Sequence, residues 1–263
     1  MRMLRLMRMP LASVLLALVA CDKEPAKRDD PAAATATPTA TAAPTATAPT
    51  KPQQSPVATP RTPQLAIDDT AVFIAGERMD VAAPDLKGRI VAALSGKPVE
   101  GETLVLNAAR DTKLPKVTSV FAALIAKKVK GVEVHTPQRD RSAAEIVFVT
   151  NAKPSDCSVA CYIAKDSAIT TWPVSGATAD RFTHGMAGPD LTRGSEGIRK
   201  RLLACESSVW FLSADENVTW GLAFDLANAV MHPEDAGLPK ARSVSLLVRT
   251  PVSGRKVDVD LVE

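Results

Sequence analysis

The chain has 263 residues, of which 32 are lysine or arginine and 29 are aspartate or glutamate, so its formal net charge is +3. That excess equals the charge of Arg2, Arg5 and Arg8, and without these three arginines basic and acidic residues balance at 29 each. A balanced chain lacks the basic surface that holds a nucleic-acid backbone, so we expect no nucleic-acid partner.

The first 21 residues have the parts of a bacterial export signal. The three arginines precede an apolar segment, residues 11–19, which is too short to persist as a membrane-spanning helix. The sequence Leu18-Val19-Ala20-Cys21 then resembles the lipobox of bacterial lipoproteins. This resemblance implies that residues 1–20 form a signal peptide that is removed and that Cys21 is the lipid attachment residue. The alternative is an ordinary export signal with a chance cysteine.

An acylated Cys21 would make membrane lipid the first partner of the protein. The acyl chains that the lipoprotein resemblance implies are sufficient for stable anchoring. The folded part would then face the periplasm, anchored to the inner or the outer membrane. Asp22 resembles the inner-membrane retention signal of enteric lipoproteins and favours the inner membrane.

Residues 21–63 read as the lipidated cysteine followed by a disordered linker. Residues 22–63 contain nine prolines and no aromatic residue, and alanine, threonine and proline dominate their middle. Such a segment cannot bury a core. About 42 residues of extended polyproline would reach ~130 Å at most. The linker is either a spacer across the envelope or a tolerated insertion without a length requirement.

The remaining chain contains the same series of elements twice, in residues 64–151 and 152–263. Each copy opens with an acidic turn and a β-rich run, at Asp69–Ile74 and Asp166–Thr171. Apolar residues at helical spacing then predict a helix over Asp85–Leu94 in the first copy and about Ser195–Cys205 in the second.

A buried strand and a long amphipathic helix follow in both copies. The strand runs, residues 103–111 and 208–215, end in Asp111 and Asp215, and apolar stripes run over residues 117–129 and 218–230. We expect the two aspartates to cap these helices rather than to act as catalytic carboxylates.

Two further strands close each copy. Strands are predicted over Val132–Thr136 and Ser243–Arg249, each followed by a Thr-Pro step, and then over Glu145–Thr150 and Lys256–Val262. The repeated order predicts an α+β fold of two small mixed-sheet domains, each with helices on one face and a core of its own. The alternative is one α+β sandwich whose halves are similar by coincidence.

Two stretches resemble the periplasmic domain of the ExbD/TolR family. They are Gly131-Val132-Glu133-Val134-His135-Thr136 and the strand-to-helix junction Ser213-Ala214-Asp215-Glu216-Asn217-Val218. The resemblance extends over about residues 65–262, although Arg110 interrupts the Ala-Asp step expected in the first copy. It implies a non-enzymatic protein of an ion-driven transport or motor complex, and TolR-like members are also associated with peptidoglycan.

One departure from the family limits this inference. The family has a transmembrane helix with a proton-carrying aspartate before the domain, and here a lipid and a linker stand in its place. We therefore expect an envelope adaptor or accessory subunit rather than a proton-channel component. Because the family's periplasmic domains form dimers, the two copies could pair within this chain.

Cys157, Cys161 and Cys205 are the remaining cysteines. Export favours a disulfide, which joins either Cys157 or Cys161 to Cys205, or joins Cys157 to Cys161. The alternative function is a thiol-redox or soft-metal-binding protein that uses Cys157 and Cys161, with His135, His184 or His232 as further ligands. Three residues separate the pair rather than two, and no histidine lies close in sequence, so we expect no metal and no cofactor.

The loop over residues 173–194 could in principle hold a hydrolase site. It contains Asp180, His184 and Asp190, with Ser175 or Ser195 as a candidate nucleophile. No motif places either serine on a strained strand-to-helix turn. We therefore expect a solvated loop and assign no catalytic residue.

Overall fold

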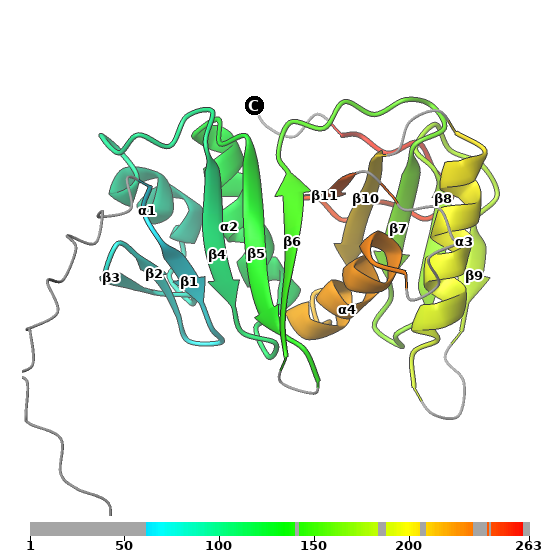
Figure 1. Cartoon of the computed structure of the whole chain (residues 1–263), viewed down its shortest axis with the longest axis horizontal. Helices are drawn as coiled ribbons and strands as arrows, with labels where there is room; N and C mark the ends of the chain where they lie inside the picture. Colours follow the sequence, from blue (N-terminus) through cyan, green and yellow to red (C-terminus); the bar gives the residue numbers. More distant parts are fainter. Residues whose placement is uncertain are drawn as a thin grey trace, which may run out of the picture. The chain divides into compact units, whose positions relative to one another are not determined.

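The computed structural model of the chain describes residues 62–139, 142–183, 188–205, 209–233, 241 and 243–259. The predicted signal peptide, Cys21 and the linker up to residue 61 lie outside these ranges, as does His184. Within them the chain forms one eleven-stranded mixed sheet and four helices (Figure 1). None of these helices combines the length and the apolar character needed to cross a membrane.

The first half of the sheet has the strand order β3-β2-β1-β4-β5-β6. β1, β4 and β5 are parallel to one another, whereas β2 is antiparallel to β1 and β6 is antiparallel to β5. Its elements are β1 (Leu65–Ile67), β2 (Ala71–Ile74), β3 (Glu77–Asp80), α1 (Leu86–Ala93), β4 (Thr103–Ala108), α2 (Leu114–Ala126), β5 (Gly131–Pro137) and β6 (Ala143–Val149).

The second half mirrors this order as β11-β10-β7-β8-β9, again with a parallel centre and an antiparallel outer pair. Its elements are β7 (Val159–Ile163), β8 (Ile169–Pro173), β9 (Asp180–Phe182), α3 (Leu191–Leu203), β10 (Val209–Ala214), α4 (Trp220–Met231) and β11 (Ser243–Leu246). β11 pairs with β6, which joins the halves.

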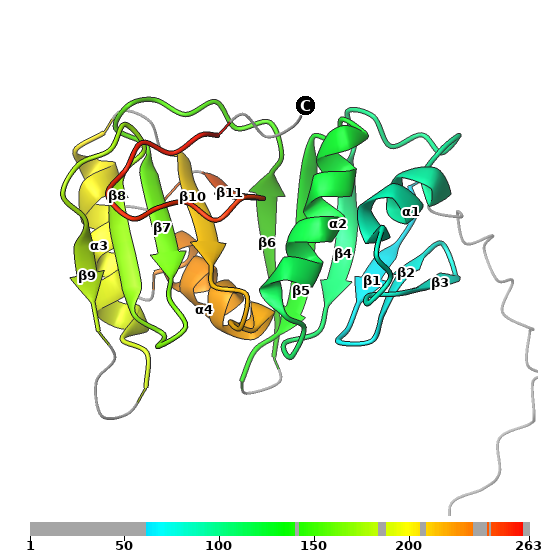
Figure 2. The ribbon, with the colours of Figure 1, turned by 180° about the vertical axis from the view of Figure 1, so that it is seen from behind.

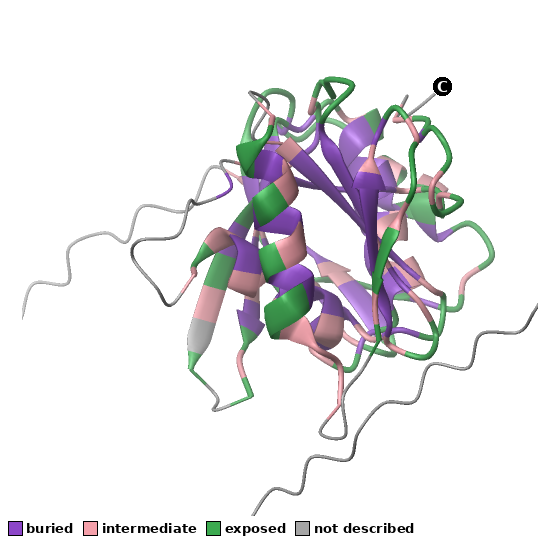
Figure 3. Cartoon of the chain, turned by 90° about the vertical axis from the view of Figure 1, so that its right-hand side faces the viewer, coloured by how far each residue is buried: buried purple, intermediate pink, exposed green. Residues whose placement is uncertain are grey.

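Each half carries its two helices on one face of its strands. In Figure 1, α3 and α4 lie in front of the second half, and Figure 2 shows α1 and α2 in front of the first half when the molecule is seen from behind. In Figure 3 the strands are mostly buried, whereas the helices are buried on one side and exposed on the other. Amphipathic helices therefore cover a sheet that is rich in buried apolar residues.

A continuous apolar core passes through both halves. It contains Leu106 and Phe121 of the first half together with Leu212 and Phe224 of the second. The ring of Phe148 contacts Phe121 at 5.7 Å and Trp220 at 5.6 Å between centroids. The mixed α+β class is confirmed, but the prediction that each half packs an interior of its own is not.

The two strand-to-helix junctions contact each other directly. The N–H of Leu114, the first residue of α2, donates to the carbonyl of Val218 at 3.0 Å. The N–H of Trp220, the first residue of α4, donates to the carbonyl of Thr112 at 2.7 Å. Helix N-termini leave backbone N–H groups without intrahelical acceptors, and here each junction supplies an acceptor to the other.

This arrangement corrects the predicted helix caps. The N-cap positions are Lys113 and Thr219, and neither makes a side-chain capping bond. Asp111 and Asp215 lie earlier in the chain, and Asp215 instead accepts the N–H of Asn217 at 2.9 Å within the preceding turn. The aspartates are not needed as caps because main-chain carbonyls of the opposite junction bind the first helical N–H groups.

Arg110 extends the contact between the halves. Its guanidinium donates to both carboxylate oxygens of Asp225 on α4, at 2.8 and 2.6 Å, and the hydrogen bond to Asp225 raises the pKa of Arg110. Arg139 also reaches Asp225, at 3.1 Å. A Cβ atom at Gly221 would lie 2.9 Å from the Cβ of Arg110, so a residue without a side chain is required there.

The C-terminal segment departs from the predicted repeat. Residues 256–259, the described part of the predicted strand Lys256–Val262, form no strand. Leu247 and Val257 instead pack against Trp172 and Phe211, on the face of the second half that its helices leave open (Figure 2). The predicted strand was wrong because the edge of β11 is already paired with β6.

The charge contact between the halves gives a prediction for stability. Asp225→Asn should lower the free energy of unfolding by about 2 kcal/mol, because it leaves Arg110 and Arg139 without a partly buried counter-charge. Urea unfolding of the purified protein measures this change.

A matched control is Asp166→Asn. Asp166 also meets an arginine, Arg181, at 2.6 Å, but both side chains are 55% exposed, against 15% for Asp225. This control should cost less than about 0.5 kcal/mol. Equal losses in the two variants would contradict the role assigned to Asp225.

Candidate functional site

The first half of the sheet has an open face opposite its helices. Strand register places Phe73, Ala66, Asn107, His135 and Glu145 side by side across β2, β1, β4, β5 and β6. Side chains alternate along a strand, so this row points away from the buried face. All five side chains remain partly or fully exposed.

The corresponding face of the second half is covered by the chain itself. Trp172 and Phe211 are fully buried beneath the C-terminal segment. The indole Nε1 of Trp172 donates to the carbonyl of Arg255 at 2.9 Å, and the N–H of Val257 donates to the carbonyl of Val174 at 2.8 Å. The C-terminal segment of the chain thus covers one face of this fold, whereas the corresponding face of the first half is open.

A hollow of about 450 Å³ lies at the end of the open face. Phe73, Ala66, Asn107 and His135 line it together with Asp68 and Pro137, where the parallel strands β1, β4 and β5 end. Ligand sites in sheets with parallel strands are commonly found beyond the carboxyl ends of those strands, and this volume suits a small ligand or one peptide side chain.

Asp68 places a negative charge at the rim of the hollow. Its carboxylate accepts the Thr70 hydroxyl at 2.8 Å and the N–H groups of Thr70 and Ala71 at 2.7 Å each. These hydrogen bonds, led by that from the Thr70 side chain, lower the pKa of Asp68, so the carboxylate is charged at neutral pH.

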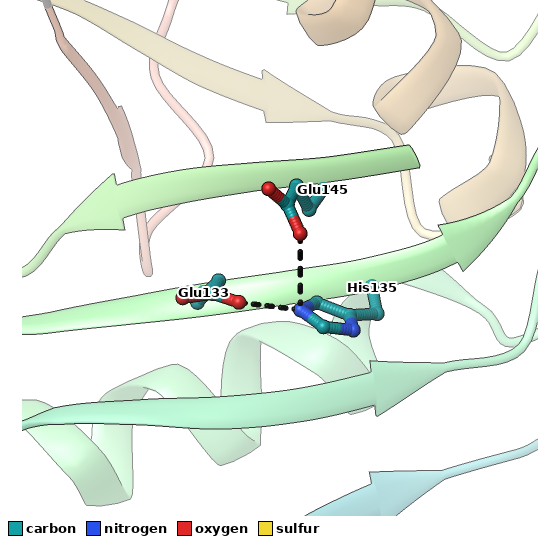
Figure 4. Close-up of side chains that lie close together, drawn as sticks. All are labelled: Glu133, His135 and Glu145. Carbon is teal, nitrogen blue, oxygen red and sulfur yellow. Dashed lines mark hydrogen bonds and ion pairs between the residues drawn. The ribbon is translucent and has the colours of Figure 1, made fainter. Parts of the chain in front are cut away.

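Three potential metal ligands meet beside the hollow (Figure 4). The Nε2 atom of His135 lies 2.6 Å from Oε1 of Glu133 and 3.7 Å from Oε2 of Glu145. Glu133 and His135 are on β5, and Glu145 faces His135 from β6. His135 was predicted as a ligand only together with the cysteines, and neither glutamate was predicted, because the register of β5 and β6 cannot be read from residue spacing.

The cysteines form a structural disulfide. Cys157 is bonded to Cys205, and their Cα atoms lie 5.5 Å apart. This bond is one of the alternative pairings predicted from the sequence. Cys161 is fully buried in β7, and burial strongly raises the pKa of its thiol. A redox pair of Cys157 and Cys161 is therefore not formed, and among the described residues no cysteine belongs to a group of three metal ligands.

The residues of the hydrolase hypothesis have structural roles where they are described. Asp190 caps α3 by accepting the N–H of Arg193, and Asp180 pairs with Arg201 at 2.6 Å. Ser195 is buried inside α3 and donates to the carbonyl of Thr192. His232 ends α4 beside Asn228.

Comparison with protein-family models, with curated proteins and with solved structures finds no match for this chain. The ExbD/TolR resemblance therefore stays a prediction from the residues quoted above.

The disulfide predicts the thiol chemistry of the folded part of the chain. With Cys157 bonded to Cys205, Cys161 is the remaining thiol of residues 62–263. Within these residues, a thiol reagent should label Cys161 alone after denaturation and no site in the native protein, because Cys161 is buried. Peptide mass spectrometry locates the label, and labelling of Cys157 or Cys205 in the denatured, unreduced protein would contradict the pairing.

Proposed function

We propose that this chain is a non-enzymatic, lipid-anchored binding protein on the periplasmic side of a bacterial membrane. The export signal and the lipobox-like step at Cys21 support the anchor. The proline-rich residues 22–63 support a linker that holds the folded part away from the lipid. Asp22 favours the inner membrane as the site of anchoring.

The unequal faces of the two half-sheets carry the proposed binding role. The chain's own C-terminal segment covers the apolar residues on one face of the second half, whereas the first half exposes a row of side chains and a hollow. Val147 lies on the same open face as Glu145 and is 46% exposed. We assign the open face to a partner that lies across it in extended form.

The partner class follows from the repeat and from the ExbD/TolR resemblance. We propose that the two halves are copies of one domain that pair within the chain as the family's domains pair between chains. The reciprocal hydrogen bonds of Leu114 and Trp220 support such a symmetric pairing. The protein would then be an adaptor or accessory subunit of an ExbD/TolR-type transport or motor complex, or would bind peptidoglycan.

The anchor is tested by replacing its cysteine. Cys21→Ser should abolish incorporation of labelled fatty acid in cells and leave residues 1–20 uncleaved, because lipidation at this cysteine precedes cleavage in bacterial lipoproteins. Mass spectrometry of the native chain should find two or three acyl chains on Cys21. A native chain cleaved elsewhere and carrying no lipid would refute the anchor.

The binding face is tested by photo-crosslinking in the native envelope. We expect p-benzoylphenylalanine at Val147 to crosslink to an ExbD/TolR-type component or to peptidoglycan fragments, identified by mass spectrometry. The control position is Leu203 on α3, which is 65% exposed but lies away from the open face. The same products from both positions, or none from Val147, would contradict the assignment.

A further inference from the structure

Glu133, His135 and Glu145 form a cluster whose positions are fixed by the sheet. His135 and Glu145 are direct cross-strand partners, and Glu133 precedes His135 by two residues, so all three side chains emerge on one face (Figure 4). The potential ligand atoms all lie within 4.8 Å of one another. Paired strands hold ligands more rigidly than loops do, which is the placement that a binding site requires.

The cluster holds more negative charge than its histidine can balance. One imidazole Nε2 offers a single proton at most, and the 2.6 Å contact commits it to Glu133. Glu145 lies 3.7 Å from the same nitrogen, beyond a normal hydrogen bond. Within the described part of the chain, the ion pairs of both glutamates are with His135 and none is with a lysine or arginine.

We propose that Glu133, His135 and Glu145 bind one divalent transition-metal ion, with Zn²⁺ as the preferred ion. One imidazole nitrogen and two carboxylates suit Zn²⁺ or Mn²⁺ better than Ca²⁺ or Mg²⁺, which take oxygen ligands. A doubly charged ion would neutralise both carboxylates at once. Among the described residues this cluster alone offers three such ligands together.

The observed distances need only small side-chain rotations to accept the ion. Ligand atoms in a tetrahedral zinc site lie about 3.3 Å apart, given metal–ligand bonds of about 2.0–2.1 Å. The separations of 2.6 and 3.7 Å fall on either side of that value. Three protein ligands leave a fourth position for water or a ligand oxygen, next to the hollow that His135 also lines.

Equilibrium dialysis of the full chain in detergent against Zn²⁺, followed by elemental analysis, tests the site. We expect one zinc ion per chain, and we expect His135→Gln and Glu145→Gln each to weaken binding more than about tenfold. The control Glu77→Gln changes an exposed glutamate of the same half that lies outside the cluster, and it should bind zinc as the native chain does.

Thermal unfolding separates a lost ligand from a lost fold. Without metal, the three variants should unfold within a few degrees of the native chain, because the altered side chains are partly or fully exposed. At a hundredfold excess over Kd, Zn²⁺ should raise the Tm of the native chain and of Glu77→Gln by roughly 5–10 °C, and should leave His135→Gln unchanged.

Two results would overturn the proposal. One is a native chain that binds no zinc at micromolar concentration, and the other is zinc binding that persists in His135→Gln and Glu145→Gln at native affinity. The proposed zinc site depends on the positions of its three side chains and not on the proposed binding role. Zinc binding and the crosslink from Val147 are separate measurements, so either can fail while the other holds.

Discussion

Two main-chain hydrogen bonds, from Leu114 to Val218 and from Trp220 to Thr112, determine how the halves of this protein fit together. A helix that starts in a protein interior must find acceptors for its first N–H groups, and the junctions provide them for each other. Each half thereby supplies an acceptor at the start of the other half's long helix. The shared core around Phe148 and Trp220 and the Arg110–Asp225 contact follow from this arrangement.

The order of strands and helices is the same in both halves except in the last segment, and that exception makes their open faces differ. β6 of the first half lies between β5 and β11, so it pairs with a strand of each half. The corresponding segment of the second half has no edge left to join and crosses the opposite face, over Trp172 and Phe211. The second half is therefore covered by its own C-terminal segment, whereas the first half exposes Phe73, His135 and the hollow to solvent.

The sequence predicts most elements but little of the site. Continuous apolar runs place the first residues of β4 and β10 within one residue of where they are observed, and the predicted helix over Asp85–Leu94 corresponds to α1. These predictions depend on residues that are close together in the sequence, and the structure contains the predicted elements. The helix caps, the last strand and the Glu133–His135–Glu145 cluster depend on which segments meet, and no local pattern contains that information. No local pattern predicts the partner of Cys205 either, because the fold brings its Cα atom to 5.5 Å from that of Cys157.

The bond from Cys157 to Cys205 closes a ring of chain that contains β7, β8, β9 and α3. Thiols pair in oxidising compartments and stay reduced in the cytosol. Under the proposed export, β7, β8, β9 and α3 would therefore gain this covalent closure only after the chain has left the cytosol. The described residues of the first half contain no cysteine, so noncovalent contacts alone hold that half together.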